Sequence, residues 1–340
     1  MSTLSLCDGL RGQFGSIGLY SAVQRCFVAF APFAFFGSLG ITAPFGRFIE
    51  GPSRWTVNGR WGWMLSEILS PLCLLYFAAA PLSTTSYTFA LPSPSHLVTS
   101  LTHLPPARKL LLFLYVAHYS NRAVVSELRN PGRSPMSFVI PLFTVPWNLT
   151  NGSLMGFWLG GGASGRAYTD YGIAGSKRLF VLGIAIWLAG FVSNIYHDEV
   201  LFRLKRAKMD ERAKQEKEKP GSAPSSAKDR YAIPQGGLYH LVSHPSYFSE
   251  WCEWSGFALA ALQLASAPFP PSASSPILRA LPSVLRPLQH WYLQPPALFV
   301  LQEIACMLPR ARSGHSWYKK TFGEEWKKKG ARWAVVPGVY

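Results

Sequence analysis

Two acidic residues, Glu250 and Glu253, lie in an otherwise apolar segment at residues 247–268. Residues three and four apart are neighbours on a helix, so both carboxyl groups would share a face with Tyr247 and Trp254. A charged residue at the centre of a membrane costs about 2.5–3.5 kcal/mol on insertion scales, and such residues usually face the protein interior and carry a function. This face is therefore a first candidate for the chemical centre.

Another carboxyl group, that of Glu67, lies in a second apolar segment, and a third contains His118, Tyr119 and Arg122. Two structural roles stay open for them: a glutamate that packs helices together, and an interfacial tyrosine beside an arginine whose charge reaches the water. The functional alternative is a pair of hydrogen-bond donors. A buried, protonated carboxyl group and a phenol can both donate to a carbonyl oxygen that gains charge during a reaction.

A fifth apolar segment ends in a polar cluster that contains Asn194, His197 and Asp198. Asn194 and Asp198 are four residues apart, so the amide and the carboxylate would share a helix face. This pair suits a ribose or a nicotinamide, although an ordinary polar helix end at the membrane interface has the same composition. A metal site would need a third ligand, and no matching residue follows.

Basic residues recur where a phosphate-bearing cofactor could be held. Arg129 and Arg133 flank a turn, and arginine binds phosphate through bidentate, charge-assisted hydrogen bonds. The tail adds four further candidates: Arg310, Arg312, His315 and Tyr318. Charged runs are usually solvated surface, so these residues indicate a site only in combination.

Composition places the chain among integral membrane proteins. Its 340 residues are 49% hydrophobic and 15% charged, whereas soluble domains carry roughly 25% charge. A spanning helix needs about 20 apolar residues, and seven runs are long enough. They lie near residues 17–37, 61–81, 109–128, 138–160, 178–197, 247–268 and 289–308. We therefore expect an all-α protein with seven transmembrane helices and no cleaved signal peptide.

The net charge of +16 describes membrane topology rather than nucleic-acid binding. With seven spans, 23 of the 33 Lys and Arg residues lie on the side of the C-terminus and eight lie on the side of the N-terminus. The positive-inside rule then predicts a cytosolic C-terminus and a luminal N-terminus. Anionic lipid headgroups are a further expected partner of the basic side.

One membrane domain should comprise residues 1–340, because no separate soluble domain is visible. The first six helices would occupy residues 17–268, including a charged cytosolic linker at 203–230, and residues 230–340 would form a C-terminal cofactor-binding part. Residues 82–106 are rich in Ser, Thr and Pro and predict an irregular luminal loop. The five cysteines are scattered and indicate neither a zinc site nor a disulfide framework.

Ten short motifs follow one another along the chain. They are Trp63-x-x-x-Glu67, His118-Tyr119-x-x-Arg122, Asn130-x-Gly132-Arg133, Asn151-Gly152, Thr169-Asp170, Asn194-x-x-x-Asp198, Ile233-Pro-x-Gly-Gly-Leu238, Glu250-x-x-Glu253-Trp254, Arg310-Ala311 and Trp317-Tyr318. In this order they resemble the steroid 5α-reductase family, from about residue 43 to the end of the chain. The similarity looks greatest to the 3-oxo-5α-steroid 4-dehydrogenases.

The resemblance implies a monomeric, seven-helix enzyme of the endoplasmic reticulum membrane that uses NADPH. Such an enzyme reduces the C4–C5 double bond of a 3-oxo-Δ4-steroid or another lipid enone. Glu67 and Tyr119 would hold the C3 carbonyl oxygen, while hydride reaches C5. The residues implied at the cofactor are Arg133, Asn194, Asp198, Tyr231, Glu250, Arg310, His315 and Tyr318. Glu250 and Glu253 become buried partners for basic residues that grip the cofactor.

Four positions depart from the family pattern: Pro131, Met155, Ser246 and Gly314. They leave the expected reaction type intact but bear on the substrate and on some cofactor contacts. Three alternatives therefore stay open: a trans-2-enoyl-CoA or polyprenal reductase of the same fold, a membrane S-adenosylmethionine-dependent methyltransferase, and a non-catalytic transporter or scaffold. Binding of NADPH would separate the reductases from the other two classes.

Overall fold

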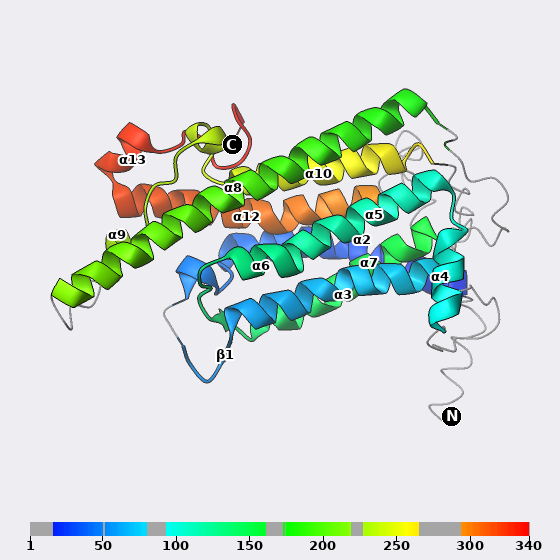
Figure 1. Cartoon of the computed structure of the whole chain (residues 1–340), viewed down its shortest axis with the longest axis horizontal. Helices are drawn as coiled ribbons and strands as arrows, with labels where there is room; N and C mark the ends of the chain where they lie inside the picture. Colours follow the sequence, from blue (N-terminus) through cyan, green and yellow to red (C-terminus); the bar gives the residue numbers. More distant parts are fainter. Residues whose placement is uncertain are drawn as a thin grey trace.

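Long helices make up most of the chain that the structure describes. The computed structural model describes residues 16–49, 52–79, 93–160, 173, 175–218, 227–264 and 294–339. Figure 1 shows the long helices side by side along the longest axis of the molecule, with α9 (Ala227–Arg230) and α13 (Glu324–Lys329) at one end and α4 (Pro94–Thr102) at the other. The expected all-α class is confirmed.

Seven of these helices coincide with the seven apolar runs. They are α2 (Ser16–Gly40), α3 (Gly59–Ala79), α5 (Pro106–Ser120), α7 (Val139–Leu159), α8 (Lys177–Glu218), α10 (Pro245–Ala261) and α12 (Pro295–Phe322). Three of them, α2, α3 and α8, are long and apolar enough to cross a membrane by length and composition. The number of seven spans and the sidedness of the termini stay predictions.

Glycines bring two pairs of helices into close contact. A Cβ atom at Gly190 of α8 would lie 2.5 Å from the backbone nitrogen of Glu253 on α10. On α7, a Cβ atom at Gly152 would lie 2.2 Å from the carbonyl oxygen of Ser70 on α3. Small residues let membrane helices approach closely, so the backbones of α8 and α10, and of α3 and α7, are held in fixed positions.

The helix that begins with α5 contains a turn of π-helix. Its α-helical hydrogen bonding ends at Ser120, a π-turn (η2, Asn121–Val125) follows, and α6 (Ser126–Arg129) continues the helix. A π-turn adds a residue to the helical repeat and occurs often at functional sites. Here it begins two residues after Tyr119 and includes Arg122, so it sets which face of the helix each side chain occupies.

Short elements close the end of the molecule that lies near α9 and α13. Strands β1 (Thr56–Val57) and β2 (Met136–Ser137) pair antiparallel, with Val57 opposite Met136. The short helices η1 (Gly46–Phe48) and η4 (Gly237–His240) belong to the loops at this end. These loops bring residues 43–48 and 231–244 against the C-terminal half of α12.

Our expectation of an irregular loop at residues 82–106 is wrong for helix α4. Ser93 is its N-cap, and the Ser93 hydroxyl accepts a hydrogen bond from the backbone N–H of His96 at 3.2 Å. Proline at the first helical position, here Pro94, suits a helix start because its missing N–H would lack a partner anyway. The rest of that loop up to residue 92, the Thr169-Asp170 motif and the Pro/Ser-rich stretch at 265–288 lie outside the described residues.

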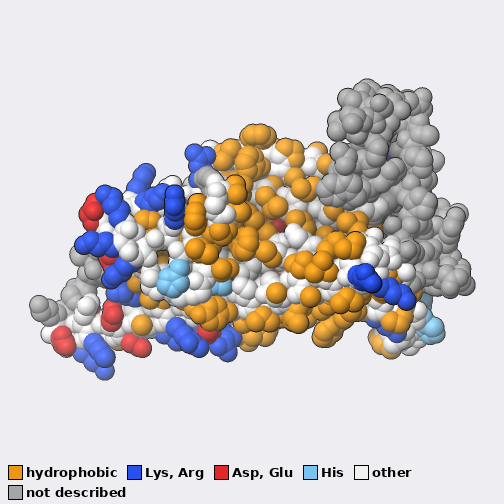
Figure 2. Space-filling model, turned by 90° about the horizontal axis from the view of Figure 1, so that it is seen from above, with side chains coloured by type: hydrophobic (Ala, Val, Ile, Leu, Met, Phe, Trp, Pro, Cys, Tyr) orange, Lys and Arg blue, Asp and Glu red, His pale blue; other side chains and the backbone are white. Residues whose placement is uncertain are grey.

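Apolar side chains are exposed along the middle of the molecule. Phe33 and Phe36 of α2 are 67% and 68% exposed, and Val181 and Val192 of α8 are 64% and 57% exposed. Figure 2 shows hydrophobic side chains over the middle of one face, with most of its Lys and Arg side chains near one end and a smaller group toward the other. Lipid is the environment in which such a surface is stable, so the protein is a membrane protein.

Candidate active site

The imidazole of His118 connects α5 to both glutamates of α10. Its Nδ1 hydrogen-bonds to Glu253 Oε1 at 2.7 Å, and its Nε2 lies 3.6 Å from Glu250 Oε1. All three side chains are buried. We expected cofactor-gripping basic residues as partners of the two glutamates, and this expectation stays a prediction. Both glutamates interact electrostatically with Arg122. The partner at hydrogen-bond distance is a histidine next to Tyr119, because the α5 helix places residue 118 toward α10.

Tyr119 is almost completely buried within a network of polar groups. Its ring lies 4.8 Å from the ring of Tyr115, centroid to centroid. The Asn151 amide of α7 donates to the Tyr115 hydroxyl at 2.8 Å and lies 3.5 Å from the Tyr119 hydroxyl. The hydroxyl of Ser70 on α3 is 2.6 Å from that of Tyr115. Three helices therefore determine the position of the Tyr119 phenol.

Glu67 lies on α3 beside this network. Its side chain interacts electrostatically with Tyr119, Arg122 and Glu250. The guanidinium carbon of Arg122 lies 5.6 Å from the centre of the Trp63 ring, one helical turn before Glu67. Glu67 therefore lies within electrostatic reach of Tyr119, the other residue expected to hold a carbonyl oxygen, and their joint role stays a prediction.

Two further residues at this place were not among our candidates. Glu303 of α12 is buried, and it interacts electrostatically with Glu67, Glu250 and Arg122. A lone glutamate in an apolar run was the signal that marked Glu67, and the same signal marks Glu303. Asn151 is the second, because it supplies the amide at Tyr119. The Asn151-Gly152 motif had been noted in the sequence, but no role had been assigned to the Asn151 side chain.

Asp198 connects this buried centre to the basic end of the molecule. It interacts electrostatically with Arg122 and His118, and its Oδ1 accepts a hydrogen bond from the Ser246 hydroxyl at 2.8 Å. Asn194 is buried one helical turn earlier on α8. Ser246 departs from the family pattern, yet it keeps a donor directed at Asp198.

The Gly-Gly turn before α10 packs against α8. Gly236 and Gly237 have φ angles of 97° and 52°, which lie in the region that favours glycine. A Cβ atom at Gly237 would lie 2.7 Å from His197 Nε2. That nitrogen accepts a hydrogen bond from the backbone N–H of Leu238 at 2.9 Å, so His197 holds the turn and is not a metal ligand here.

Arg47 is the centre of an aromatic cluster that includes two expected cofactor residues. Its guanidinium carbon lies 4.4 Å from the ring centre of Tyr318, 4.7 Å from that of Trp317 and 5.8 Å from that of Tyr231. Its Nη2 donates to the Tyr318 hydroxyl at 3.3 Å. Its buried Nη1 has no hydrogen-bond partner within the described chain. Sequence reasoning missed Arg47, because its loop shows no periodic pattern.

Two expected cofactor arginines have structural partners. Both amino groups of Arg310 donate to backbone carbonyls, Nη1 to Ala43 at 3.2 Å and Nη2 to Phe45 at 3.3 Å. The guanidinium of Arg133 forms a two-pronged ion pair with the buried carboxylate of Glu127. These arginines therefore fix the loops around the basic end.

His315 and His244 share one serine next to Gly314. The Ser243 hydroxyl lies 2.9 Å from Nδ1 of each ring. Burial lowers the pKa of His315 to about 4, with a smaller effect from Lys319. A Cβ atom at Gly314 would lie 2.4 Å from His244 Nε2, so the imidazole of His244 occupies the space next to this glycine. Gly314 departs from the family pattern, and the structure gives this departure a steric reason.

The geometry divides the candidate residues into two neighbouring groups. Tyr119, Glu250 and His118 are buried and form one group with Glu67 and Arg122, which are half-buried. The remaining candidates lie toward the basic end: Arg133, Asn194, Asp198, Tyr231, Arg310, His315 and Tyr318. Asp198 interacts with residues of the buried centre, so the two groups are continuous. A long molecule with an anionic end and a reactive end would fit this arrangement.

Comparisons with known proteins agree with the motifs. The profile of the 3-oxo-5-alpha-steroid 4-dehydrogenase family matches residues 222–275. An uncharacterized protein of Schizosaccharomyces pombe is 32% identical over 94% of this chain and 98% of its own length. The 3-oxo-5-alpha-steroid 4-dehydrogenase 1 of Mus musculus is 27% identical over 87% of this chain and 88% of its own length.

A plant relative extends the comparison. A steroid 5-alpha-reductase of Arabidopsis thaliana is 29% identical over 74% of this chain and 80% of its own length. These matches span nearly all of the helices that hold the candidate residues. The chain therefore belongs to the steroid 5α-reductase family.

Proposed function

We propose that this protein uses NADPH to reduce the C4–C5 double bond of a 3-oxo-Δ4-steroid to the 5α product. The observation that carries the proposal is the electrostatic interaction of the half-buried Glu67 with the buried Tyr119, beside residues suited to a dinucleotide. Family membership supports a reductase of this class, and the exposed apolar helices support a substrate that arrives from lipid.

Glu67 and Tyr119 would act on the C3 carbonyl oxygen. The Tyr119 hydroxyl is held by Tyr115 and Asn151, so it can donate without first reorganising. A protonated Glu67 would donate the second hydrogen bond. Donors fixed at a place where negative charge develops are worth about 10²–10³-fold in rate, because a water-excluded site screens them poorly.

The reaction balances with one hydride and one proton. NADPH, when bound, would supply the hydride for C5. Glu67 and Tyr119 would stabilise by hydrogen bonding the negative charge that moves from the double bond to the C3 oxygen. A proton from water would bond to C4 as the carbonyl re-forms, so that the saturated ketone is the product.

Residues at the basic end fit the cofactor by their chemistry. The Nη1 of Arg47, which has no partner among the described residues, is a buried cationic donor that a phosphate oxygen would satisfy. The flat rings of Tyr231 and Tyr318 beside it suit a planar base. Asn194 and Asp198 lie nearer Arg122 and would hold the ribose and amide of the nicotinamide end. His315 would also line the cofactor site. Arg133 and Arg310 would act indirectly, because they fix the loops around this site. Glu250 would position His118 and so support the site from the buried centre.

The membrane arrangement is part of the same proposal. We infer a monomeric enzyme of the endoplasmic reticulum with seven spans, a luminal N-terminus and a cytosolic C-terminus. Residues 17–268 would then contain the first six helices and the linker at 203–230, and residues 230–340 would form the cofactor-binding part. The gathering of Lys and Arg at one end of Figure 2 supports a cytosolic basic end.

One assay tests the reaction and its alternatives. Microsomes that contain the protein are given NADPH and a 3-oxo-Δ4-steroid, and the products are identified by mass spectrometry. The expected result is a 5α-reduced steroid and one NADP⁺ per product. Reduction of a trans-2-enoyl-CoA or a polyprenal without any steroid product would overturn the substrate. Failure of the purified protein to bind NADPH would overturn the whole class of reaction and leave a methyltransferase or a scaffold.

A further inference from the structure

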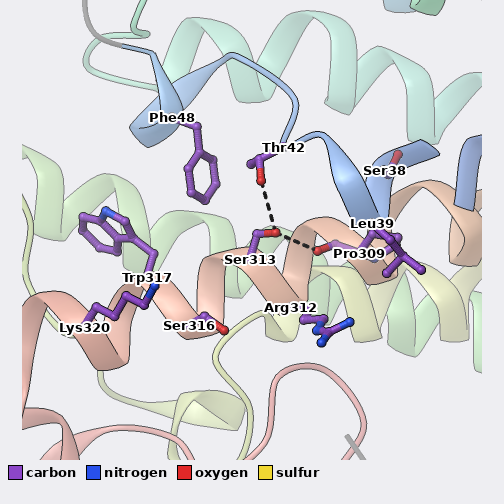
Figure 3. Close-up of a pocket in the computed structure, with 10 residues that line it drawn as sticks. All are labelled: Ser38, Leu39, Thr42, Phe48, Pro309, Arg312, Ser313, Ser316, Trp317 and Lys320. Atoms are coloured by element: carbon purple, nitrogen blue, oxygen red, sulfur yellow. Dashed lines mark hydrogen bonds between the residues drawn. The ribbon is translucent and has the colours of Figure 1, made fainter. Parts of the chain in front are cut away.

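A polar cavity lies on the outside of α12 and shares Trp317 with the aromatic cluster around Arg47. It has a volume of about 430 Å³ and is lined by the end of α2, the following loop and one face of α12. Figure 3 shows the lining residues: Ser38, Leu39, Thr42, Phe48, Pro309, Arg312, Ser313, Ser316, Trp317 and Lys320. Four of them carry hydroxyl groups and two are cations, whereas none carries a carboxylate.

The cations of this cavity are not used elsewhere in the described structure. Arg312 and Lys320 are exposed, and neither forms an ion pair among the described residues. They lie two helical turns apart on α12 with Ser316 between them, and both line the cavity (Figure 3). An anion that leaves water for a protein site needs cations and hydrogen-bond donors to replace its hydration, and the lining of this cavity supplies both.

The hydroxyl groups of the cavity are ordered by a short chain of hydrogen bonds. Thr42 Oγ1 lies 3.4 Å from Ser313 Oγ, and Ser313 Oγ donates to the carbonyl oxygen of Pro309 at 3.2 Å. This chain links the loop after α2 to α12, as the dashed lines in Figure 3 show. It holds the two walls of the cavity together while Ser316 stays exposed to a ligand.

The cavity lies where the apolar surface of the molecule ends. Its α2 wall is Leu39, and Phe36 lies one turn earlier on the same face, with exposures of 45% and 68%. On α12 no cation precedes Arg310, whereas four lie between residues 310 and 320. A ligand in this cavity would therefore have its charged part against α12 and an apolar part along α2.

We propose that this cavity binds the phosphate headgroup of an anionic membrane phospholipid. Arg312 and Lys320 would contact the phosphate, Ser316 would donate to it, and an acyl chain would lie along Leu39 and Phe36. A soluble phosphate would use the same cations but not the apolar wall, which is the reason to commit to a lipid. The site is separate from Glu67 and Tyr119, so it does not depend on the reductase proposal.

Native mass spectrometry of the full-length protein in detergent tests this site with a short-chain phosphatidic acid as the probe. A Lys or Arg near an anionic surface strengthens binding about fivefold, so the Arg312→Gln/Lys320→Gln variant should bind about thirtyfold more weakly. The matched control Lys327→Gln/Lys328→Gln removes the same charge from α13 and should bind as the wild type does. Equal weakening in both variants, or in neither, would overturn the site.

Two further measurements separate a lipid in this cavity from a soluble anion and from a lipid bound elsewhere. Ser316→Glu places a carboxylate between the two cations and should abolish binding, while its unfolding temperature stays at the wild-type value because residue 316 is exposed. Inorganic phosphate should not displace the bound lipid at equal concentration. Displacement would show that the cavity takes a soluble anion, which contradicts the lipid assignment. Undiminished binding to Ser316→Glu would place the lipid elsewhere.

Discussion

His118 Nδ1 lies 2.7 Å from Glu253 Oε1, and this hydrogen bond joins α5 to α10 inside the protein. His118 precedes Tyr119, so the bond also orients the helical turn that carries the phenol. Glu253 in turn is held by the close approach of α8 at Gly190. The glutamate is thus a positioning residue, and the reacting groups lie beside it.

Removing the donors at the carbonyl site should slow the reaction without unfolding the protein. We expect Glu67→Gln and Tyr119→Phe each to reduce turnover by about 10²-fold or more, because each deletes one donor to the developing oxyanion. Steady-state rates with NADPH and a 3-oxo-Δ4-steroid measure the effect. Tyr196→Phe and Glu211→Gln are matched controls on the exposed surface and should keep wild-type rates. Full activity in both site variants would exclude this mechanism.

The hydrogen bond from His118 to Glu253 should stabilise the folded protein, because the Glu253 side chain supplies an acceptor oxygen to the buried imidazole. Glu253→Ala leaves a buried imidazole without a partner and should cost about 1–3 kcal/mol of unfolding free energy. Glu253→Gln keeps an acceptor oxygen and should cost less. Denaturant unfolding in detergent compares the two, with exposed Glu211→Ala as the control. Equal losses for Ala and Gln would mean that charge rather than hydrogen bonding holds His118.

A methyl group at residue 190 should displace α10. We expect Gly190→Ala to cost about 1–3 kcal/mol, because its Cβ atom would meet the backbone of Ser249 and Glu253 within 2.7 Å. Turnover should fall as well, since Glu253 orients His118. Gly37→Ala on α2 is the matched control, because a Cβ atom there meets nothing within 4 Å. If both variants unfold at the same temperature, the close contact of α8 and α10 is wrong.

Acidification should destabilise the protein through His315. The pKa of His315 is lowered to about 4 in the folded state by burial, against an unfolded value near 6.5. The unfolded chain therefore binds the extra proton first, and stability should fall as the pH drops from about 6.5 to about 4. One proton gives a slope of about 1.4 kcal/mol per pH unit.

Unfolding of the cofactor-free protein across this pH range measures the slope. His315→Gln cannot take up the proton, so its stability should depend less on pH. The same slope in the variant and in the wild type would mean that other groups cause the acid sensitivity.

Arg47 should matter for the cofactor and little for the steroid. Arg47→Gln removes a buried charged donor, and bonds to charged groups are worth about 1.5–3 kcal/mol, so KM for NADPH should rise about 10- to 100-fold. The KM for steroid should stay near its wild-type value. Arg54→Gln, an exposed arginine in the same stretch of chain, is the control. A loss of kcat with unchanged KM for NADPH would contradict this role.

Local patterns in the sequence predicted the helices and most of the candidate residues. Runs of apolar residues placed all seven long helices to within a few residues, except that α8 continues through the charged segment to Glu218 and α12 continues to Phe322. Both extensions are rich in charged residues such as Lys, Arg and Glu, which favour helix formation but lower the hydropathy. Helix α4 was missed because its Ser93 cap lies in a stretch whose composition is typical of loops.

What the sequence determined by itself was the kind of residue and the helix that carries it: a carboxyl group, a phenol and an amide on apolar helices, in an order that identifies the family. Tertiary structure alone decided which of them meet. The glycine contact at Gly190 and the loop that brings Arg47 to Tyr318 each join elements far apart in the chain. Helical periodicity describes neighbours three and four residues apart, whereas the contacts of Glu303 and Asn151 arise only when whole helices pack.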